Sequence, residues 1–181
     1  MDDLIQLADL VRKRNALERQ ITALIGRPAQ IGHIGEYIAS RIFGIELKES
    51  ASFKSIDGHF RDGVLKGCSV NIKWYALREG LLDLTDVPPD YYLVLTGSKS
   101  SVMRSRGRVR PWTIDGVFLF EALPLFAHLR TRGVQLGVAC SVIESTWQAA
   151  EVYPKQTCTK LFLSNEQRLQ LDLFRSNRDE G

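Results

Sequence analysis

The residue types best suited to hydrolytic chemistry lie in two short runs in the middle of the chain. Residues 56–60 read Ile-Asp-Gly-His-Phe and residues 70–75 read Val-Asn-Ile-Lys-Trp-Tyr. Because successive side chains point to opposite faces of a strand, each run predicts a strand with one apolar and one polar face. The polar faces carry Asp57 in the first run and Asn71 with Lys73 in the second. A carboxylate, an amide oxygen and an ammonium group close together could bind a divalent cation and a phosphate.

The length of the turn between the two runs decides whether these groups meet. Asp62-Gly63 is a two-residue hairpin signal. Closing the hairpin there would turn Asp57 to the apolar face of the second run, since a one-residue slip reverses every side chain. A longer loop over residues 61–67 sets Asp57 opposite Asn71 and keeps the apolar residues together, so we expect that register. The alternative is an ordinary amphipathic hairpin whose polar face lies in water.

Asp57 followed by Asn71-Ile72-Lys73 resembles the pattern of the PD-(D/E)xK nuclease superfamily, an acid on one strand and (D/E)-x-K on the next. The resemblance covers residues 30–97. A wider pattern, IASRIFGIEL…IDG…VNIKWY…PDYYLVLTG, is also similar to a bacterial family of small proteins. The superfamily resemblance implies a restriction-endonuclease-like core, hydrolysis of DNA with Mg²⁺ or Mn²⁺, and a restriction or defence setting. The chain departs from the pattern at Asn71, where the superfamily usually has a second acid.

The chemistry of a hard cation gives each residue of this set an expected role. Mg²⁺ prefers oxygen ligands and keeps several waters, so Asp57 is the expected central ligand. The side-chain carbonyl of Asn71 and the backbone carbonyl of Ile72 could add two neutral oxygens. Glu36 could restore the charge that Asn71 lacks. Lys73 would orient the attacking water or stabilise the charge that grows on the phosphate.

Glu36 lies in a predicted helix over residues 32–43. On a helical wheel Ile34, Ile38 and Ile42 form the apolar stripe, and Glu36 lies nearly opposite that stripe. The resemblance favours Glu36 as a site residue. The wheel favours a solvated carboxylate, so both interpretations stay open.

Residues 98–114 contain no acid and carry a charge of +5. The charged residues are Lys99, Arg104, Arg106, Arg108 and Arg110. The four arginines alternate with other residues, as along a strand or an extended loop, and such a stripe could hold the phosphates of DNA. A solvated basic loop is the alternative. Trp112, just beyond, could stack on a base, but we expect it in the core.

Residues 3–25 predict a long amphipathic helix, ended by Gly26 and Pro28. Its apolar positions are Leu4, Leu7, Val11, Leu17, Ile21, Leu24 and Ile25, with a gap at Arg14. We expect this helix to cover the core. The alternative is a dimerisation or docking helix; as a dimerisation helix it would make the protein a homodimer.

The rest of the chain alternates strands and helices. Predicted strands are 91–96, 117–120, 137–142 and 161–163, and predicted helices are 122–132 and 147–153. The sequence Ser-Asn-Glu-Gln at 164–167 is a capping box for a last helix, with Leu169, Leu173 and Phe174 expected on its inner side. This order predicts an α/β fold with a mixed central sheet flanked by helices. We expect one domain over residues 1–181, built from the helix and its exit (1–30), a nuclease-like core (31–97) and a basic segment with the last elements (98–181).

Composition indicates a soluble globular protein. The 181 residues are 44% hydrophobic and 25% charged, with a net charge of +3, which is compatible with nucleic acid. The three cysteines form no C-x-x-C pair, so free thiols in a reducing cytoplasm are expected. No signal peptide or apolar run of membrane-spanning length is present, so we expect a cytoplasmic protein with no membrane partner. Besides a nuclease, two other function classes fit: a nucleic-acid-binding module that has lost catalysis, and a structural or interaction protein.

Overall fold

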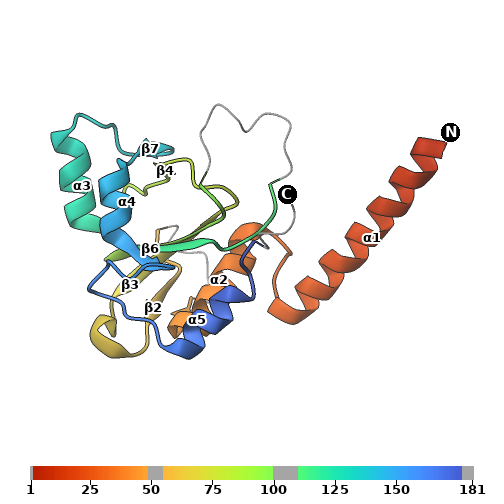
Figure 1. Ribbon diagram of the computed structural model, residues 1–181, viewed down its shortest axis with the longest axis horizontal. Coiled ribbons are helices and arrows are strands. Elements are labelled where there is room, and N and C mark those ends of the chain that lie inside the picture. The colour runs from red at the N-terminus through yellow and green to blue at the C-terminus, as the bar shows by residue number, and fades with distance from the viewer. Residues whose placement is uncertain (1, 49–54, 100–109, 177–181) are drawn as a thin grey trace.

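The computed structural model describes residues 2–48, 55–99 and 110–176. Its centre is a six-stranded mixed sheet (Figure 1). The strands of this sheet, in spatial order, are β1 (Ile45–Leu47), β2 (Gly58–Phe60), β3 (Ser69–Tyr75), β5 (Tyr91–Thr96), β6 (Gly116–Glu121) and β8 (Glu151–Tyr153). Strands β3 and β5 are parallel, and every other neighbouring pair is antiparallel. The fold is therefore α/β with a mixed central sheet, as predicted.

Helices cover both faces of this sheet. They are α2 (Ile31–Phe43) and α5 (Asn165–Asp172) on one face and α3 (Ala122–Thr131) and α4 (Glu144–Ala150) on the other. A further helix, α1 (Asp2–Ile25), does not lie on the sheet (Figure 1). Helices α2 and α5 lie side by side, and α3 and α4 lie together away from them (Figure 1). A short ladder of β4 (Leu81–Leu82) and β7 (Cys140–Ser141) packs near α3 and α4.

Alternation along the strands divides the core into two clusters, one on each face. On the first face, Val70, Ile72 and Trp74 of β3 pack with residues of α2 and α5. On the second face, Tyr92 of β5 and Phe118 of β6 pack with residues of α3 and α4. Strand β5 is buried along its whole length, as its continuous apolar run predicts. The sheet thus leaves Asn71 and Lys73 on the face opposite α2.

Three predicted elements late in the chain are wrong. Only Cys140 and Ser141 of the predicted strand 137–142 form a ladder, because Gly137 and Ala139 adopt φ values of 146° and 57° that break the extended run. The predicted helix 147–153 is instead the end of α4 followed by β8, since Val152 and Tyr153 are buried on joining the sheet beside β6. Residues 161–163 form no strand.

The capping box of the last helix is confirmed, but its inner side is wrong. The Ser164 side chain accepts from the Gln167 backbone, and the Gln167 side chain accepts in return from the Ser164 backbone. The residue that α5 buries is Leu171, whereas Leu169 and Leu173 are exposed. Leu171 of α5 is buried in the cluster that contains the α2 residues, and the Gln167 side chain donates to the Ile42 carbonyl of α2 at 2.7 Å.

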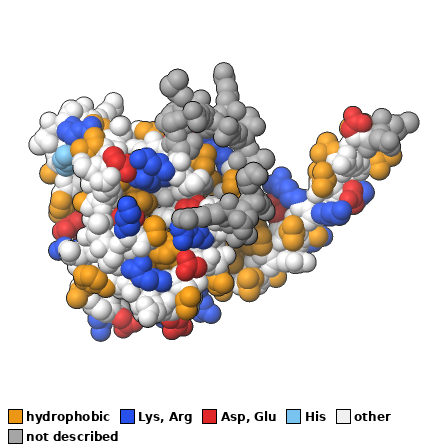
Figure 2. All heavy atoms as spheres, in the orientation of Figure 1, with side chains coloured by type: hydrophobic (Ala, Val, Ile, Leu, Met, Phe, Trp, Pro, Cys, Tyr) orange, Lys and Arg blue, Asp and Glu red, His pale blue; other side chains and the backbone are white. Residues whose placement is uncertain are grey.

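Helix α1 does not cover the core. It extends away from the body of the protein (Figure 1), and its apolar side chains lie along a projecting rod (Figure 2). Leu4, Leu17 and Leu24 are 71%, 59% and 73% exposed. The helix is long and amphipathic as predicted, but the covering role is wrong. None of the helices in the described part of the chain combines the length and apolar character that a membrane span requires.

Candidate active site

Asp57 lies just before strand β2, where the pairing of β2 with β3 ends among the described residues. The ladder pairs Gly58 with Val70 and His59 with Ser69, so the next pair in this register is Asp57 with Asn71. The loop that follows β2 contains a 3-10 turn, η1 (Gly63–Leu65), rather than a two-residue turn. The predicted register is confirmed.

The Asp57 side chain accepts the hydrogen bond that a backbone carbonyl of β2 would accept if the strand pairing continued. The Asp57 N–H donates to the Val70 carbonyl at 2.9 Å, and its Oδ2 accepts from the Ile72 N–H at 2.6 Å. The N–H and carbonyl of one strand residue point to the same edge, so the Ile72 carbonyl also faces Asp57. On the other side of β2, Gly58 lets β1 lie close, because a Cβ there would be 2.4 Å from the Glu46 carbonyl oxygen.

Burial raises the pKa of Asp57, and nearby charges modify that effect. The largest cause is desolvation of the carboxylate; the hydrogen bond from Ile72 lowers the pKa, and the Glu36 charge raises it. Lys73 and Arg27 lower it by their positive charges. The fold therefore places Glu36, Lys73 and Arg27 within electrostatic reach of Asp57, and desolvation is the effect that disfavours the ionised carboxylate most.

Helix α2 brings Glu36 to this group. Gly35 lies directly against β3, where a Cβ would be 3.0 Å from the Cβ of Trp74, so the helix axis lies close to the strand. The Glu36 side chain is only 17% exposed and forms an ion pair with Arg27. Glu36 is thus not the solvated carboxylate of the helical wheel. Arg27 belongs to the candidate site through its pairing with Glu36, and the sequence did not single it out because no motif surrounds it between α1 and α2.

Asn71 and Lys73 lie on the second face of β3. Asn71 is 3% exposed, and its Oδ1 has no hydrogen-bond partner among the described residues. Lys73 is half-buried and forms no ion pair with any residue that the structure describes, although its charge acts on Asp57. A buried amide oxygen without a donor is costly, so the Asn71 Oδ1 is an acceptor whose hydrogen-bonding capacity the described residues leave unused.

The basic stretch is only partly described. Arg104, Arg106 and Arg108 lie outside the described residues. Lys99 Nζ lies 3.1 Å from Glu144, and Arg110 lies 3.4 Å from Glu79. The segment itself contains no acid, but acids distant in sequence pair with these two residues.

Trp112 follows the basic stretch and is not in the core. Its side chain is 47% exposed, and its ring lies 6.3 Å from that of Trp74 in a tilted contact. The expectation that it is a core residue is wrong. An exposed indole beside β3 keeps base stacking available to it.

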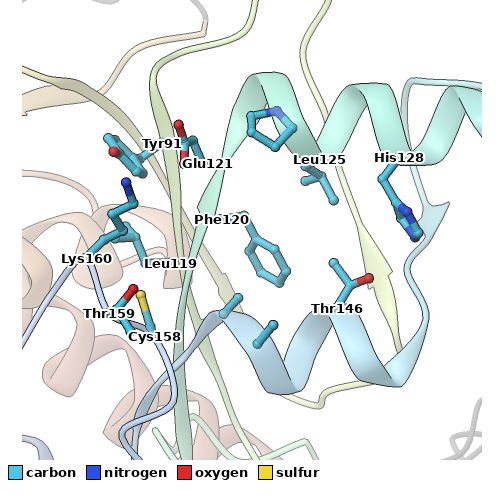
Figure 3. A pocket seen from close by; sticks show the side chains of 13 residues that line it. Tyr91, Leu119, Phe120, Glu121, Leu125, His128, Thr146, Cys158, Thr159 and Lys160 are labelled. Atoms are coloured by element: carbon cyan, nitrogen blue, oxygen red, sulfur yellow. The ribbon is translucent and has the colours of Figure 1, made fainter.

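A separate hollow lies between α3, α4 and residues 158–160. Its volume is about 260 Å³, and none of the sequence-predicted site residues lines it. Figure 3 shows His128 at one end, with Lys160 and Cys158 at the other, so its polar groups do not converge. The Asp57 group is the stronger candidate because its charges act on one another.

The donor set at the β3 edge is mixed. Within the described residues, no group of three or more His, Cys, Asp and Glu side chains is arranged to hold a metal ion. The candidate oxygens here come from two carboxylates, one amide and one backbone carbonyl. No protein-family model matches the chain, and no curated protein matches it significantly.

Proposed function

We propose that the protein is a metal-dependent nuclease that hydrolyses phosphodiester bonds in DNA, with the open edge of β3 as its active site. The observation that carries this proposal is the desolvated Asp57 carboxylate at the start of β2, within electrostatic reach of Glu36 and Lys73. Desolvated acids with raised pKa values, gathered with other charged groups, are typical of functional sites.

The residues around Asp57 carry oxygens of the kind that a hard cation binds. Asp57 uses Oδ2 to accept from Ile72, which leaves Oδ1 for a ligand. The Asn71 Oδ1 has no donor among the described residues. Glu36 supplies a second carboxylate beside Arg27. A set with few carboxylates that leaves room for water and a substrate phosphate suits Mg²⁺ or Mn²⁺, which when bound would polarise the phosphate and acidify a water.

The protein's own groups have separable tasks in this proposal. Lys73 has no ion pair among the described residues, so its ammonium can face the scissile phosphate and stabilise the charge that develops there. The Ile72 N–H holds one Asp57 oxygen and so fixes the orientation of the other. Arg27 holds Glu36 in place while limiting the repulsion between the two acids.

A second candidate function is a nucleic-acid-binding module without catalysis. Two observations favour it. Asn71 is neutral where the superfamily pattern has an acid, and Arg27 already neutralises Glu36. Such a module would bind DNA through its basic stretch and would need no metal.

Cleavage assays separate these functions. Purified protein is incubated with double- and single-stranded DNA and with RNA, each with Mg²⁺, Mn²⁺ or EDTA. We expect metal-dependent DNA cleavage that Asp57→Asn and Lys73→Ala each reduce by about 100-fold or more. Asp62→Asn and Lys66→Ala are the matched controls, because both side chains are exposed on the same hairpin outside the site. Absence of cleavage with either metal, or full cleavage by Asp57→Asn, would contradict the nuclease proposal.

Salt titration tests the binding step independently of cleavage. If the basic stretch binds phosphates, Arg106→Ala with Arg108→Ala should lower the slope of log affinity against log salt by about 0.9 for each phosphate that is no longer neutralised. Measurement in EDTA keeps the DNA intact. An unchanged slope and affinity would remove this stretch from the DNA interface.

A further inference from the structure

Helix α1 presents a long apolar surface that no described part of the chain covers. Leu7, Leu10 and Leu17 are each more than half exposed, and the row of apolar side chains is visible along the projecting helix (Figure 2). Isolated helices are only marginally stable in water, and most gain their stability by packing an apolar face. A helix of this length and exposure therefore needs a partner.

The apolar residues follow a heptad repeat, the spacing that packs one helix along another. With Leu7 at position a, the a and d positions are Leu7, Leu10, Arg14, Leu17, Ile21 and Leu24. Every d position from residue 10 onward is leucine. One polar residue, Arg14, interrupts the a positions. Leucine at these d positions with one polar a residue is a coiled-coil pattern, and a single polar a residue fixes register and partner number at a cost in stability. Leu4, Val11 and Ile25 at e widen the apolar face beside this seam.

The flanking charges indicate which helix the partner is. Lys13 occupies position g and Glu18 the e position five residues later. In a parallel pair of identical helices, each g residue meets the e residue of the following heptad on its partner. Lys13 of each copy would therefore meet Glu18 of the other. Within one helix Glu18 also accepts from Arg14 at 3.0 Å, which would draw the guanidinium toward the rim of the seam.

We propose that α1 is a dimerisation helix whose partner is α1 of a second copy, in a parallel coiled coil with the seam Leu7–Leu24. The parallel arrangement places both Arg14 side chains in one layer, near the acids that can pair with them. An antiparallel pair would set each Arg14 against an apolar d layer instead. This inference does not depend on the proposed nuclease activity.

Sedimentation equilibrium of the full chain tests the dimer. We expect a dimer for the wild type and a monomer for Leu10→Glu with Leu17→Glu. Ile5→Glu is the matched control, because Ile5 is 62% exposed but lies at position f, outside the seam. Arg14→Leu should tighten the dimer at least about tenfold. Circular dichroism checks that each variant stays folded.

The proposal fails if the wild type remains a monomer at about 100 µM, a concentration at which even a weak dimer with a Kd of about 10 µM would be mostly assembled. It also fails if the seam variants dimerise like the wild type, or if Ile5→Glu disrupts the dimer as strongly as they do. A monomer that binds anionic vesicles through α1 would assign the helix to a membrane surface instead.

Charge exchange and cross-linking test the orientation. Lys13→Glu and Glu18→Lys should each weaken the dimer, and the double variant should restore it. Leu24→Cys in a Cys68→Ser background should form a disulfide-linked dimer on oxidation, because identical d residues face each other only in a parallel, in-register pair. Failure of the double variant to restore the dimer, or absence of the cross-link in a dimeric protein, would exclude this geometry.

Discussion

Two carboxylates on this fold have opposite electrostatic environments. Glu144 is paired with Arg78, which donates two hydrogen bonds of 3.2 Å, and with Lys99 at 3.1 Å. Desolvation raises the pKa of Glu144, but the bonds from Arg78 and Lys99 outweigh it and lower the pKa. Asp57 forms no ion pair among the described residues, and burial raises its pKa.

The comparison separates a structural acid from a candidate functional one. At Glu144 the chain supplies two cations, and Arg78 also lies over the rings of Phe118 and Trp147, at 5.3 and 5.6 Å from their centres. That arrangement ties α4 to the sheet. At Asp57 the chain supplies one backbone donor and more distant charges, so the anion retains capacity for a cation. Acids that cost stability are expected at sites under functional constraint.

The largest expected effect concerns the Arg78 pairing. Arg78→Ala removes both hydrogen bonds to Glu144 and the packing against two aromatic rings, so the free energy of unfolding should fall by about 2 kcal/mol. Lys99→Ala removes a cation from the same acid at an exposed position and should cost about 0.5 kcal/mol. Urea denaturation measures both. Equal effects would mean that the acid, rather than the ring packing of Arg78, stabilises this region.

An intermediate effect is expected when Asn71 is made acidic. Asn71→Asp adds the carboxylate that the superfamily pattern has, so Mn²⁺ affinity should rise about tenfold, or about 1.4 kcal/mol. Without metal the variant should be less stable, because a third acid joins Asp57 and Glu36 in a buried place. Calorimetric titration and melting with and without Mn²⁺ measure the two changes. A gain in metal-free stability would contradict the arrangement.

The smallest effect is the pH dependence of stability at Asp57. The raised pKa means that the folded protein is penalised when Asp57 ionises, whereas Asp57→Asn does not titrate. Below the ordinary value of 3.8 the acid is protonated in both states and the penalty is absent. As pH rises above 3.8 through the raised pKa, the wild type should lose stability relative to Asp57→Asn. Denaturation of both proteins across this range gives the sign, and a difference that shrinks as pH rises would contradict it.

Local patterns predicted the parts of this fold that depend on neighbours in sequence. The alternation of apolar and polar residues predicted β3, and the continuous apolar run predicted β5. The requirement that apolar residues share one face predicted the register between β2 and β3. Arg27 could not be predicted, because its pairing with Glu36 depends on how the chain turns between α1 and α2. The sequence could not predict that α1 projects from the body, because a helix has the same amphipathic pattern whether its apolar face packs on the core or on another helix. The counter-ions of Lys99 and Arg110 come from acids far away in sequence.

Calorimetric titration of Mn²⁺ into the wild type, Asp57→Asn and Asp62→Asn tests the central claim that the β3 edge is a cation site. Asp57→Asn keeps an acceptor for the Ile72 N–H, so it removes the charge without removing the hydrogen bond. We predict that the wild type and the exposed control Asp62→Asn bind Mn²⁺ alike and that Asp57→Asn loses at least about 90% of that affinity. Equal binding by all three proteins, or no binding by the wild type, would contradict the account.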